Sequence, residues 1–189
     1  PLAESGIVGT AIGMAMYGLR PIVEMQFDAF SFPAFEQIVS HVAKMRNRTR
    51  GRVPLPMVIR IPTSGGIGGV EHHSDSSEAY WTHTPGLTVV TPSNPADAYS
   101  MLREAIASDD PVIFLEPKSH YWMKQTAEPA SPPLPMNKAA VVREGTDVTL
   151  ISYGRQVNIL LKVADRLAKD DGVEAEVVDL RSIRPFDTE

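Results

Sequence analysis

The sequence predicts an α/β fold whose first part has a mostly parallel sheet, and two observations carry this prediction. Short apolar segments with the composition of strands alternate along the chain with longer segments that have helical periodicity. Hydrophobic residues make up 43% of the 189 residues, which is enough for a substantial buried core. A chain of this length is expected to form one larger or two smaller domains.

The helices and strands of the first part follow from local patterns. In chain order, we expect a buried helix over residues 4–18, a strand over 20–27, a helix over 32–51, strands over 56–62 and 87–92, a helix over 94–108 and a strand over 109–117. The helix over 32–51 has the clearest pattern, because apolar residues from Phe35 to Met45 recur at helical spacing. The helix over 94–108 should begin near Ser93 or Asn94, since both residue types commonly cap helices.

A proline-rich segment separates a second part from the first. Four prolines lie between residues 129 and 135 without apolar periodicity, so we place a linker at 119–140. The first domain would then span 1–118 and lack its N-terminal part, and 141–189 would be the truncated beginning of a second α/β domain. In that domain we expect a strand over 146–154, a helix over 155–172 and another strand with its exit loop over 173–187. The chain lacks an initiator methionine and stops without a terminal element, which indicates an internal fragment.

Composition and charge exclude several classes of function. The net charge of −5 argues against nucleic acid or an anionic membrane as the main partner. The absence of cysteine excludes disulfides and thiolate zinc sites. No run of about 18 apolar residues occurs, so no segment is expected to span a membrane.

The stretch "GGIGGVEHHSDSSEAYW" at residues 65–81 places two histidines directly behind a glycine-rich loop. Adjacent side chains of an extended chain point to opposite sides, so His72 and His73 are poorly arranged to share a metal ion. Two interpretations then remain open. The stretch is either a structural turn or a loop that handles protons, since histidine titrates near neutrality and glycine lets the backbone approach a ligand closely.

Glu4 stands at the front of a helix that is otherwise apolar and rich in glycine. A carboxylate at a helix N-terminus usually interacts with the helix dipole or caps the helix. In apolar surroundings the same carboxylate could instead share a proton with a ring nitrogen of a ligand. The residues alone do not decide between these two roles.

Four stretches of the chain, in order and with their spacing preserved, resemble a known family. They are "PLAESGIVG", "EMQFDAFSFPAFEQIVSHVAK", "GGIGGVEHHSDSSEAYW" and "DDPVIFLEPK". Together they are similar to the β subunit of the thiamine-diphosphate-dependent 2-oxo acid dehydrogenases. The segment "FPAFEQIV" favours the branched-chain (2-oxoisovalerate) enzymes over the pyruvate enzymes. The resemblance implies a transketolase-like pyrimidine-binding domain followed by the start of a transketolase C-terminal-like domain.

The resemblance also implies roles for individual residues. Glu4 matches the glutamate that hydrogen-bonds the aminopyrimidine ring of thiamine diphosphate and so assists removal of the thiazolium proton. Leu2, Gln26 and Phe30 match positions that line the aminopyrimidine, although tyrosine is common where this chain has Phe30. Ring stacking survives that exchange, but a hydroxyl hydrogen bond does not. His73 matches the histidine that binds the 2-oxo acid and assists acyl transfer to a lipoyl group.

A potassium ion, bound mainly by main-chain oxygens, is a further feature that the resemblance implies. The matching positions are Leu55, Met57, Val58, Ala105, Ser108 and Asp110. Two of them depart from the family, because Val58 offers no side-chain oxygen where relatives have threonine and Ser108 replaces a usual aspartate.

The partners follow from what the chain lacks. It has no "GDG…N" motif for magnesium and diphosphate, and in the family that site lies on the α subunit. The resemblance therefore implies an α2β2 heterotetramer that shares the cofactor between chains, oxidises branched-chain 2-oxo acids and passes acyl groups to a lipoyl acyltransferase core. The expected location is the cytoplasm of a bacterium, or the mitochondrial matrix of a eukaryote.

Two alternatives to the branched-chain enzyme stay open. The first is a β subunit of a pyruvate or acetoin dehydrogenase, because the α chain also contributes to the substrate pocket. The second, for these residues by themselves, is a noncatalytic assembly module that binds partners without chemistry.

Overall fold

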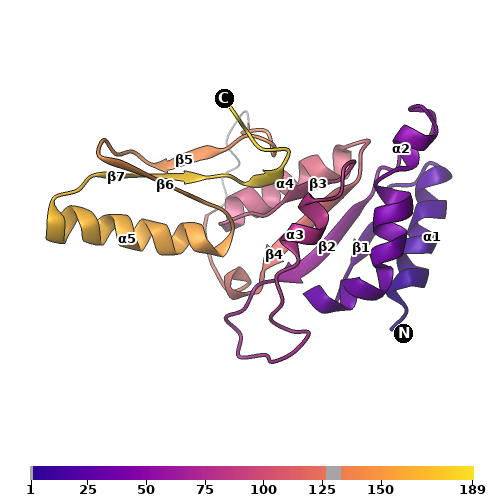
Figure 1. Cartoon of the computed structure of the whole chain (residues 1–189), viewed down its shortest axis with the longest axis horizontal. Coiled ribbons are helices and arrows are strands. Elements are labelled where there is room, and N and C mark those ends of the chain that lie inside the picture. Colours follow the sequence, from indigo (N-terminus) through magenta and orange to yellow (C-terminus); the bar gives the residue numbers. More distant parts are fainter. Residues whose placement is uncertain (1, 127–132) are drawn as a thin grey trace.

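The computed structural model describes residues 2–126 and 133–189, which form two sheets lying along the long axis of the molecule (Figure 1). The first sheet has five strands in the order β1-β2-β4-β3-β8, and the second has three in the order β5-β7-β6. Four strands of the first sheet, β1, β2, β4 and β3, are parallel to one another, so the predicted α/β class with a mostly parallel sheet is confirmed.

The bounds of the elements agree with most of the predicted segments. The first part contains α1 (Glu4–Met16), β1 (Ile22–Glu24), the 3-10 helix η1 (Asp28–Ala34), the π-helix η2 (Gln37–Val42), α2 (Met45–Arg48), β2 (Val58–Thr63), α3 (Glu78–Thr82), β3 (Thr88–Val90), α4 (Pro95–Ala107), β4 (Val112–Pro117) and the 3-10 helix η3 (Lys118–His120). The second part contains β5 (Ala140–Arg143), β6 (Val148–Ser152), α5 (Arg155–Asp171), β7 (Ala175–Asp179) and β8 (Ser182–Arg184). The side chain of Asn94 caps α4 by accepting a hydrogen bond from the Asp97 amide, as the sequence predicts.

Both faces of the first sheet are covered, because successive side chains of a strand point to opposite faces. Ile59 and Ile113, which are register partners, belong to a core cluster with α1, η2 and α3. Val58 and Phe114 belong to a second cluster with α4 on the other face. The sheet is therefore packed on both faces, and the segments that carry Gln26, Phe30 and His73 follow the ends of β1 and β2.

The single regular helix expected over residues 32–51 is wrong. The segment is instead a 3-10 helix, a π-helix and a short α-helix in succession. The Ala43 amide donates to the Ile38 carbonyl five residues earlier, which is the hydrogen bond of a π-helix. Gly86, with a φ of 100°, packs its backbone against the Ala43 carbonyl, and a Cβ there would lie 1.9 Å from that oxygen. This close approach accompanies the break between η2 and α2.

The second sheet is covered by a helix on one face, where α5 packs below it (Figure 1). Strand β6 is parallel to β7 and β5 is antiparallel to it. The predicted helix over 155–172 is confirmed, and it ends at Gly172 in the left-handed conformation. Strand β5 begins at the predicted end of the linker and was not expected from the sequence.

The strand expected at the start of 173–187 is confirmed, but the exit loop expected after it contains a further strand. The chain forms β7, turns at Arg181 with a φ of 55°, and continues as β8, which pairs antiparallel with β3 of the first sheet. The chain thus returns from the second sheet to the first through β8, and no local pattern in the sequence indicates this pairing.

Arg181 forms a second connection between the two sheets. Its fully buried guanidinium pairs with Asp97 at 2.9 Å and donates to the carbonyl oxygens of Pro135 and Lys138, both at 2.8 Å. The later part of the predicted linker is therefore hydrogen-bonded to Arg181. Residues 127–132 of this linker lie outside the described residues. The domain limits at 118 and 141 stay a prediction.

In the part of the chain that the structure describes, each helix is too short or too polar to cross a membrane.

Candidate functional site

The predicted cofactor residues lie on two elements that pack together. Glu4 is the first residue of α1 and its side chain is largely buried, with 7% of the residue exposed. Phe30 is half-buried in η1, which contacts α1. Gln26 is exposed directly after β1, and Leu2 is 73% exposed just before α1. No ion pair within residues 2–126 and 133–189 involves the Glu4 carboxylate.

An aromatic cluster forms where η1 meets the glycine-rich loop. The ring centroids of Phe27 and His73 lie 4.4 Å apart, and those of Phe30 and His73 lie 5.9 Å apart with perpendicular planes. Edge-to-face contacts at such distances are favourable. The structure thus brings Phe30 and His73 together, as the predicted site requires.

The expectation that the two histidines point to opposite sides of an extended loop is wrong. His72 has a φ of 64°, so the backbone turns there instead of running straight. Its ring centroid lies 6.4 Å from that of Phe30, which means that both histidines approach the same ring. The stretch is therefore a turn and also brings imidazoles to the aromatic cluster, so the two interpretations do not exclude each other.

A backbone contact fixes the tautomer of His73. Its Nδ1 lies 2.7 Å from the carbonyl oxygen of Glu71. A carbonyl oxygen only accepts hydrogen bonds, so Nδ1 must carry the proton. In the neutral ring, Nε2 is then the atom that can accept a proton from a substrate and return it.

The six positions predicted for potassium lie on two neighbouring stretches of chain. They are Leu55, Met57 and Val58 at the start of β2, and Ala105, Ser108 and Asp110 around the C-terminal end of α4, which leads into the adjacent strand β4.

Arg20 already places a positive charge beside the second stretch. Its Nη1 donates to the carbonyl oxygen of Ser108 at 2.7 Å and to those of Ile106 and Ala107 at 3.2 Å. A potassium ion at Ser108 would share that oxygen with the guanidinium, although a carbonyl oxygen has a second lone pair. The potassium site stays a prediction.

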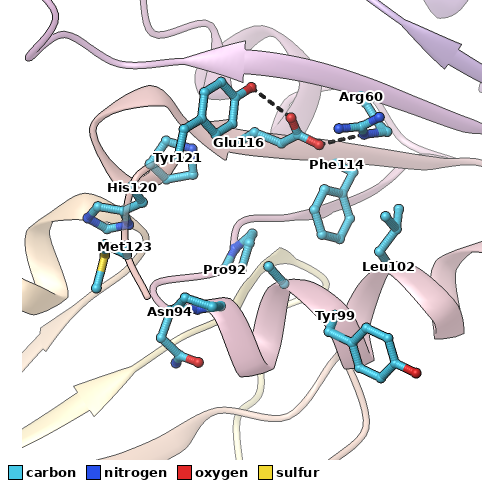
Figure 2. A pocket seen from close by; sticks show the side chains of 13 residues that line it. Arg60, Pro92, Asn94, Tyr99, Leu102, Phe114, Glu116, His120, Tyr121 and Met123 are labelled. Atoms are coloured by element: carbon cyan, nitrogen blue, oxygen red, sulfur yellow. Dashed lines mark hydrogen bonds and ion pairs between the residues drawn. The ribbon is translucent and has the colours of Figure 1, made fainter. Parts of the chain in front are cut away.

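A cavity of about 370 Å³ opens between α4 and β4, and its thirteen lining residues include none of the predicted site residues (Figure 2). Arg60 Nε donates to Glu116 Oε1 at 2.6 Å, and the Tyr121 hydroxyl donates to Glu116 Oε2 at 2.7 Å. Burial, and after it the Glu116 carboxylate, raises the pKa of Tyr121, so the hydroxyl remains a donor. Both oxygens of Glu116 are thus satisfied within the protein, and the cavity is separate from the candidate site.

Sequence reasoning missed three residues beside the candidate site: Phe27, Asp28 and Lys118. Phe27 and Asp28 directly follow Gln26, and an acidic residue between two phenylalanines was the available signal. Lys118 had no local signal, because it lies beside them only once β4 is placed next to β2.

Comparisons with known proteins match both parts of the chain. Residues 1–123 match the family described as transketolase, pyrimidine binding domain, and residues 137–189 match transketolase, C-terminal domain. A solved structure described as "Split gene transketolase, inactive beta4 tetramer" superposes with a TM-score of 0.81 at 25% identity, over 98% of this chain and 57% of that chain.

Several curated relatives are similar to nearly the whole chain. It is 54% identical to the pyruvate dehydrogenase E1 component subunit beta of Leifsonia xyli subsp. xyli, over 99% of this chain and 55% of the relative. It is 53% identical to the 3-methyl-2-oxobutanoate dehydrogenase subunit beta of Mycobacterium tuberculosis, over 99% and 54%. The chain thus spans little more than half the length of these relatives. Since the two domain matches cover most of its residues, the chain belongs to the transketolase-like family, with a pyrimidine-binding domain followed by transketolase C-terminal domain sequence.

Proposed function

We propose that the chain belongs to the β subunit of a thiamine-diphosphate-dependent 2-oxo acid dehydrogenase that acts on branched-chain 2-oxo acids. The observation that carries this proposal is the contact of the His73 ring with Phe27 and Phe30, where η1 packs against the helix that begins with Glu4. The relatives support the enzyme class, but their names divide between pyruvate and 3-methyl-2-oxobutanoate at 54% and 53% identity. The branched-chain preference rests on the segment "FPAFEQIV".

The described residues fit the aminopyrimidine end of this cofactor. A half-buried phenylalanine offers a face for ring stacking, the unpaired Glu4 carboxylate offers an acceptor, and the exposed Gln26 amide offers both donor and acceptor. When bound, thiamine diphosphate supplies the carbanion-stabilising chemistry that releases carbon dioxide from a 2-oxo acid. Glu4 would hold a proton opposite a ring nitrogen, and Leu2, Gln26 and Phe30 would orient the ring.

His73 would handle the proton of the acyl-transfer step. The bond from Nδ1 to Glu71 holds the ring in one tautomer and leaves Nε2 for the reacting group. The Phe27 ring packs beside the imidazole, with 4.4 Å between the ring centroids.

The magnesium and diphosphate would be held by an α subunit in an α2β2 heterotetramer located in the bacterial cytoplasm. The acyl group would pass to a lipoyl acyltransferase core. A potassium ion at the six predicted main-chain positions belongs to the same proposal, with Arg20 sharing the Ser108 carbonyl.

The substrate is tested with the full-length subunit assembled with its α partner. We expect kcat/KM for 2-oxoisovalerate to exceed that for pyruvate by about 10-fold or more, because each buried methylene group is worth about 10- to 200-fold in discrimination. A preference for pyruvate would instead assign the chain to the pyruvate type.

The site assignment is tested in the same complex by replacing Glu4 or His73. Glu4→Gln should slow exchange of the cofactor's thiazolium proton by about 10²- to 10⁴-fold, since that is the usual contribution of general acid–base groups. His73→Ala should reduce acylation of a lipoyl domain by a similar factor. His72→Ala is the matched control, and a larger effect at His72 than at His73 would move the assignment by one residue.

A noncatalytic assembly role is the second candidate for these residues by themselves. It is supported by the superposable structure that is described as an inactive β4 tetramer. Calorimetry that finds tight, magnesium-dependent binding of thiamine diphosphate to this chain alone would contradict it.

A further inference from the structure

One buried carboxylate joins both ends of the histidine loop, which we define as residues 64–77. Figure 1 shows this loop leaving the end of β2 and returning at α3. Asp28 Oδ2 accepts a hydrogen bond from the Thr63 hydroxyl at 2.7 Å and another from the Ser77 amide at 3.1 Å. Thr63 is the last residue of β2 and Ser77 precedes α3, so the two bonds close the base of the loop.

The closure counters a large entropic cost. The loop contains Gly65, Gly66, Gly68 and Gly69, and glycine loses more conformational freedom on ordering than any other residue. Hydrogen bonds to an ionised carboxylate are stronger than those between neutral groups. A single charged side chain, itself fully buried, can therefore hold both ends of a segment that is otherwise costly to order.

A buried lysine, Lys118, lies near this carboxylate. The other oxygen of Asp28, Oδ1, is buried and has no hydrogen-bond partner among the described residues. Lys118 is 2% exposed and directly follows Pro117, the register partner of Thr63, and its Nζ reaches the Pro62 carbonyl at 3.5 Å. Burial lowers the pKa of Lys118, and the carboxylates of Asp28, Asp75 and Glu78 oppose that shift.

Asp28 and Lys118 are also connected to His73 through Phe27. Lys118 Nζ lies 5.9 Å from the centre of the Phe27 ring, within the range of a cation–π contact. The Phe27 ring contacts His73 at 4.4 Å between centroids, and Phe27 is the chain neighbour of Asp28. The base of the loop and the ring on which His73 rests are thus held by adjacent residues.

We propose that Asp28 and Lys118 are positioning residues for His73: Asp28 closes the base of the histidine loop, while Lys118 balances its charge and supports Phe27. This inference rests on the function proposed above, because it gives the two residues a purpose in the acyl-transfer step. Neither residue touches the reacting atoms, so their effect on chemistry passes entirely through the placement of the imidazole.

The first test replaces the charge of Asp28 while keeping its shape, in the full-length subunit assembled with its partner. Asp28→Asn should speed hydrogen exchange of the amides in residues 64–77 by about tenfold, since loss of a charged buried acceptor leaves donors poorly satisfied. The kcat for lipoyl acylation should fall with it, while the affinity for thiamine diphosphate stays unchanged.

Asp179→Asn is the matched control. Asp179 is equally buried and its carboxylate also accepts two hydrogen bonds, from Ser93 and from the Arg181 amide, but it lies in the second sheet. This variant should not raise exchange in the histidine loop selectively. Exchange in residues 64–77 that is unchanged in Asp28→Asn, or that rises equally in both variants, overturns the proposal.

A second pair of variants keeps the test decisive if Asp28→Asn fails to fold. Thr63→Val removes one of the two donors at the base of the loop and should raise exchange there by a smaller factor. Its control is Thr84→Val, because Thr84 is also buried but donates to the Tyr80 carbonyl. Equal loop exchange in the two threonine variants overturns the proposal.

The role of the Lys118 charge is tested by comparing Lys118→Arg with Lys118→Met. The arginine variant should restore most of the lipoyl acylation that the methionine variant loses, whereas a purely space-filling role predicts no such rescue. Selective loop exchange in Asp28→Asn combined with normal lipoyl acylation by His73→Ala would leave the loop closure standing and remove the proposed function of His73. Normal exchange in Asp28→Asn with an inactive His73→Ala would do the reverse.

Discussion

The two sheets of the molecule differ in how completely they are buried. All six residues of β4 in the first sheet are buried, with helices on both faces. In the second sheet α5 covers one face, and Ile151 of β6 remains 59% exposed on the other. The stability of the described chain is therefore concentrated around the first sheet, which also carries the candidate site.

The greatest loss of stability is expected for a substitution at Arg181, which tests whether the two sheets unfold as one unit. Arg181→Met removes a fully buried cation that bonds Asp97 and three carbonyl oxygens of residues 133–139. We expect a loss of about 3–5 kcal/mol in the free energy of unfolding, because breaking a buried ion pair leaves its partner uncompensated. Urea unfolding measures this loss. The control Arg166→Met removes an exposed pair with Asp170 and should change the free energy by about 0.5 kcal/mol or less.

Two identical substitutions test the difference in burial itself. Ile113 in β4 is 0% exposed, and Ile151 in β6 is 59% exposed. Ile113→Ala should lower the free energy of unfolding by about 2–5 kcal/mol, since it leaves a cavity in a packed core. Ile151→Ala should lower it by about 0.5 kcal/mol or less, as expected for a surface change. Similar losses in the two variants would show that the open face of the second sheet is covered in solution.

The least change in stability is expected at Glu78, a carboxyl group beside the histidine loop. Burial raises the pKa of Glu78 above its ordinary value of 4.5, and the charge of Asp28 adds to this. Between the unfolded and folded pKa the native state binds more protons, so this group makes stability fall as pH rises. Glu78→Gln should therefore be more stable than wild type well above pH 4.5 and equal to it well below. Thermal unfolding well above and well below pH 4.5 checks this, and a variant that is less stable than wild type at the higher pH contradicts it.

The parts of the fold that depend on local pattern were predictable. The cap at Asn94, the helix over 155–172 and the buried strands around Ile59 and Ile113 all follow from residues close in sequence. Strand β8 did not follow, because its pairing with β3 depends on a partner far away in the chain. The π-helix did not follow either, since Ala43 meets Gly86 only in the folded protein.

The candidate site divides in the same way. Glu4, Phe30 and His73 came from a resemblance, and the structure places Phe30 against His73. The bond from Thr63 to Asp28 joins residues 35 positions apart, and the neighbourhood of Lys118 depends on sheet order. The role of a buried charged residue follows from the residues that it contacts. When those residues are distant in sequence, they cannot be identified until the order of the strands is known.

The return of β8 to the first sheet has a consequence for synthesis of the protein on the ribosome. Strand β3 is translated long before residues 182–184, and until these emerge, one edge of β3 lacks its neighbour in the sheet. An unpaired strand edge invites pairing with another chain. In the nascent pyrimidine-binding domain, this edge of β3 therefore stays unpaired until the whole second sheet has been synthesised.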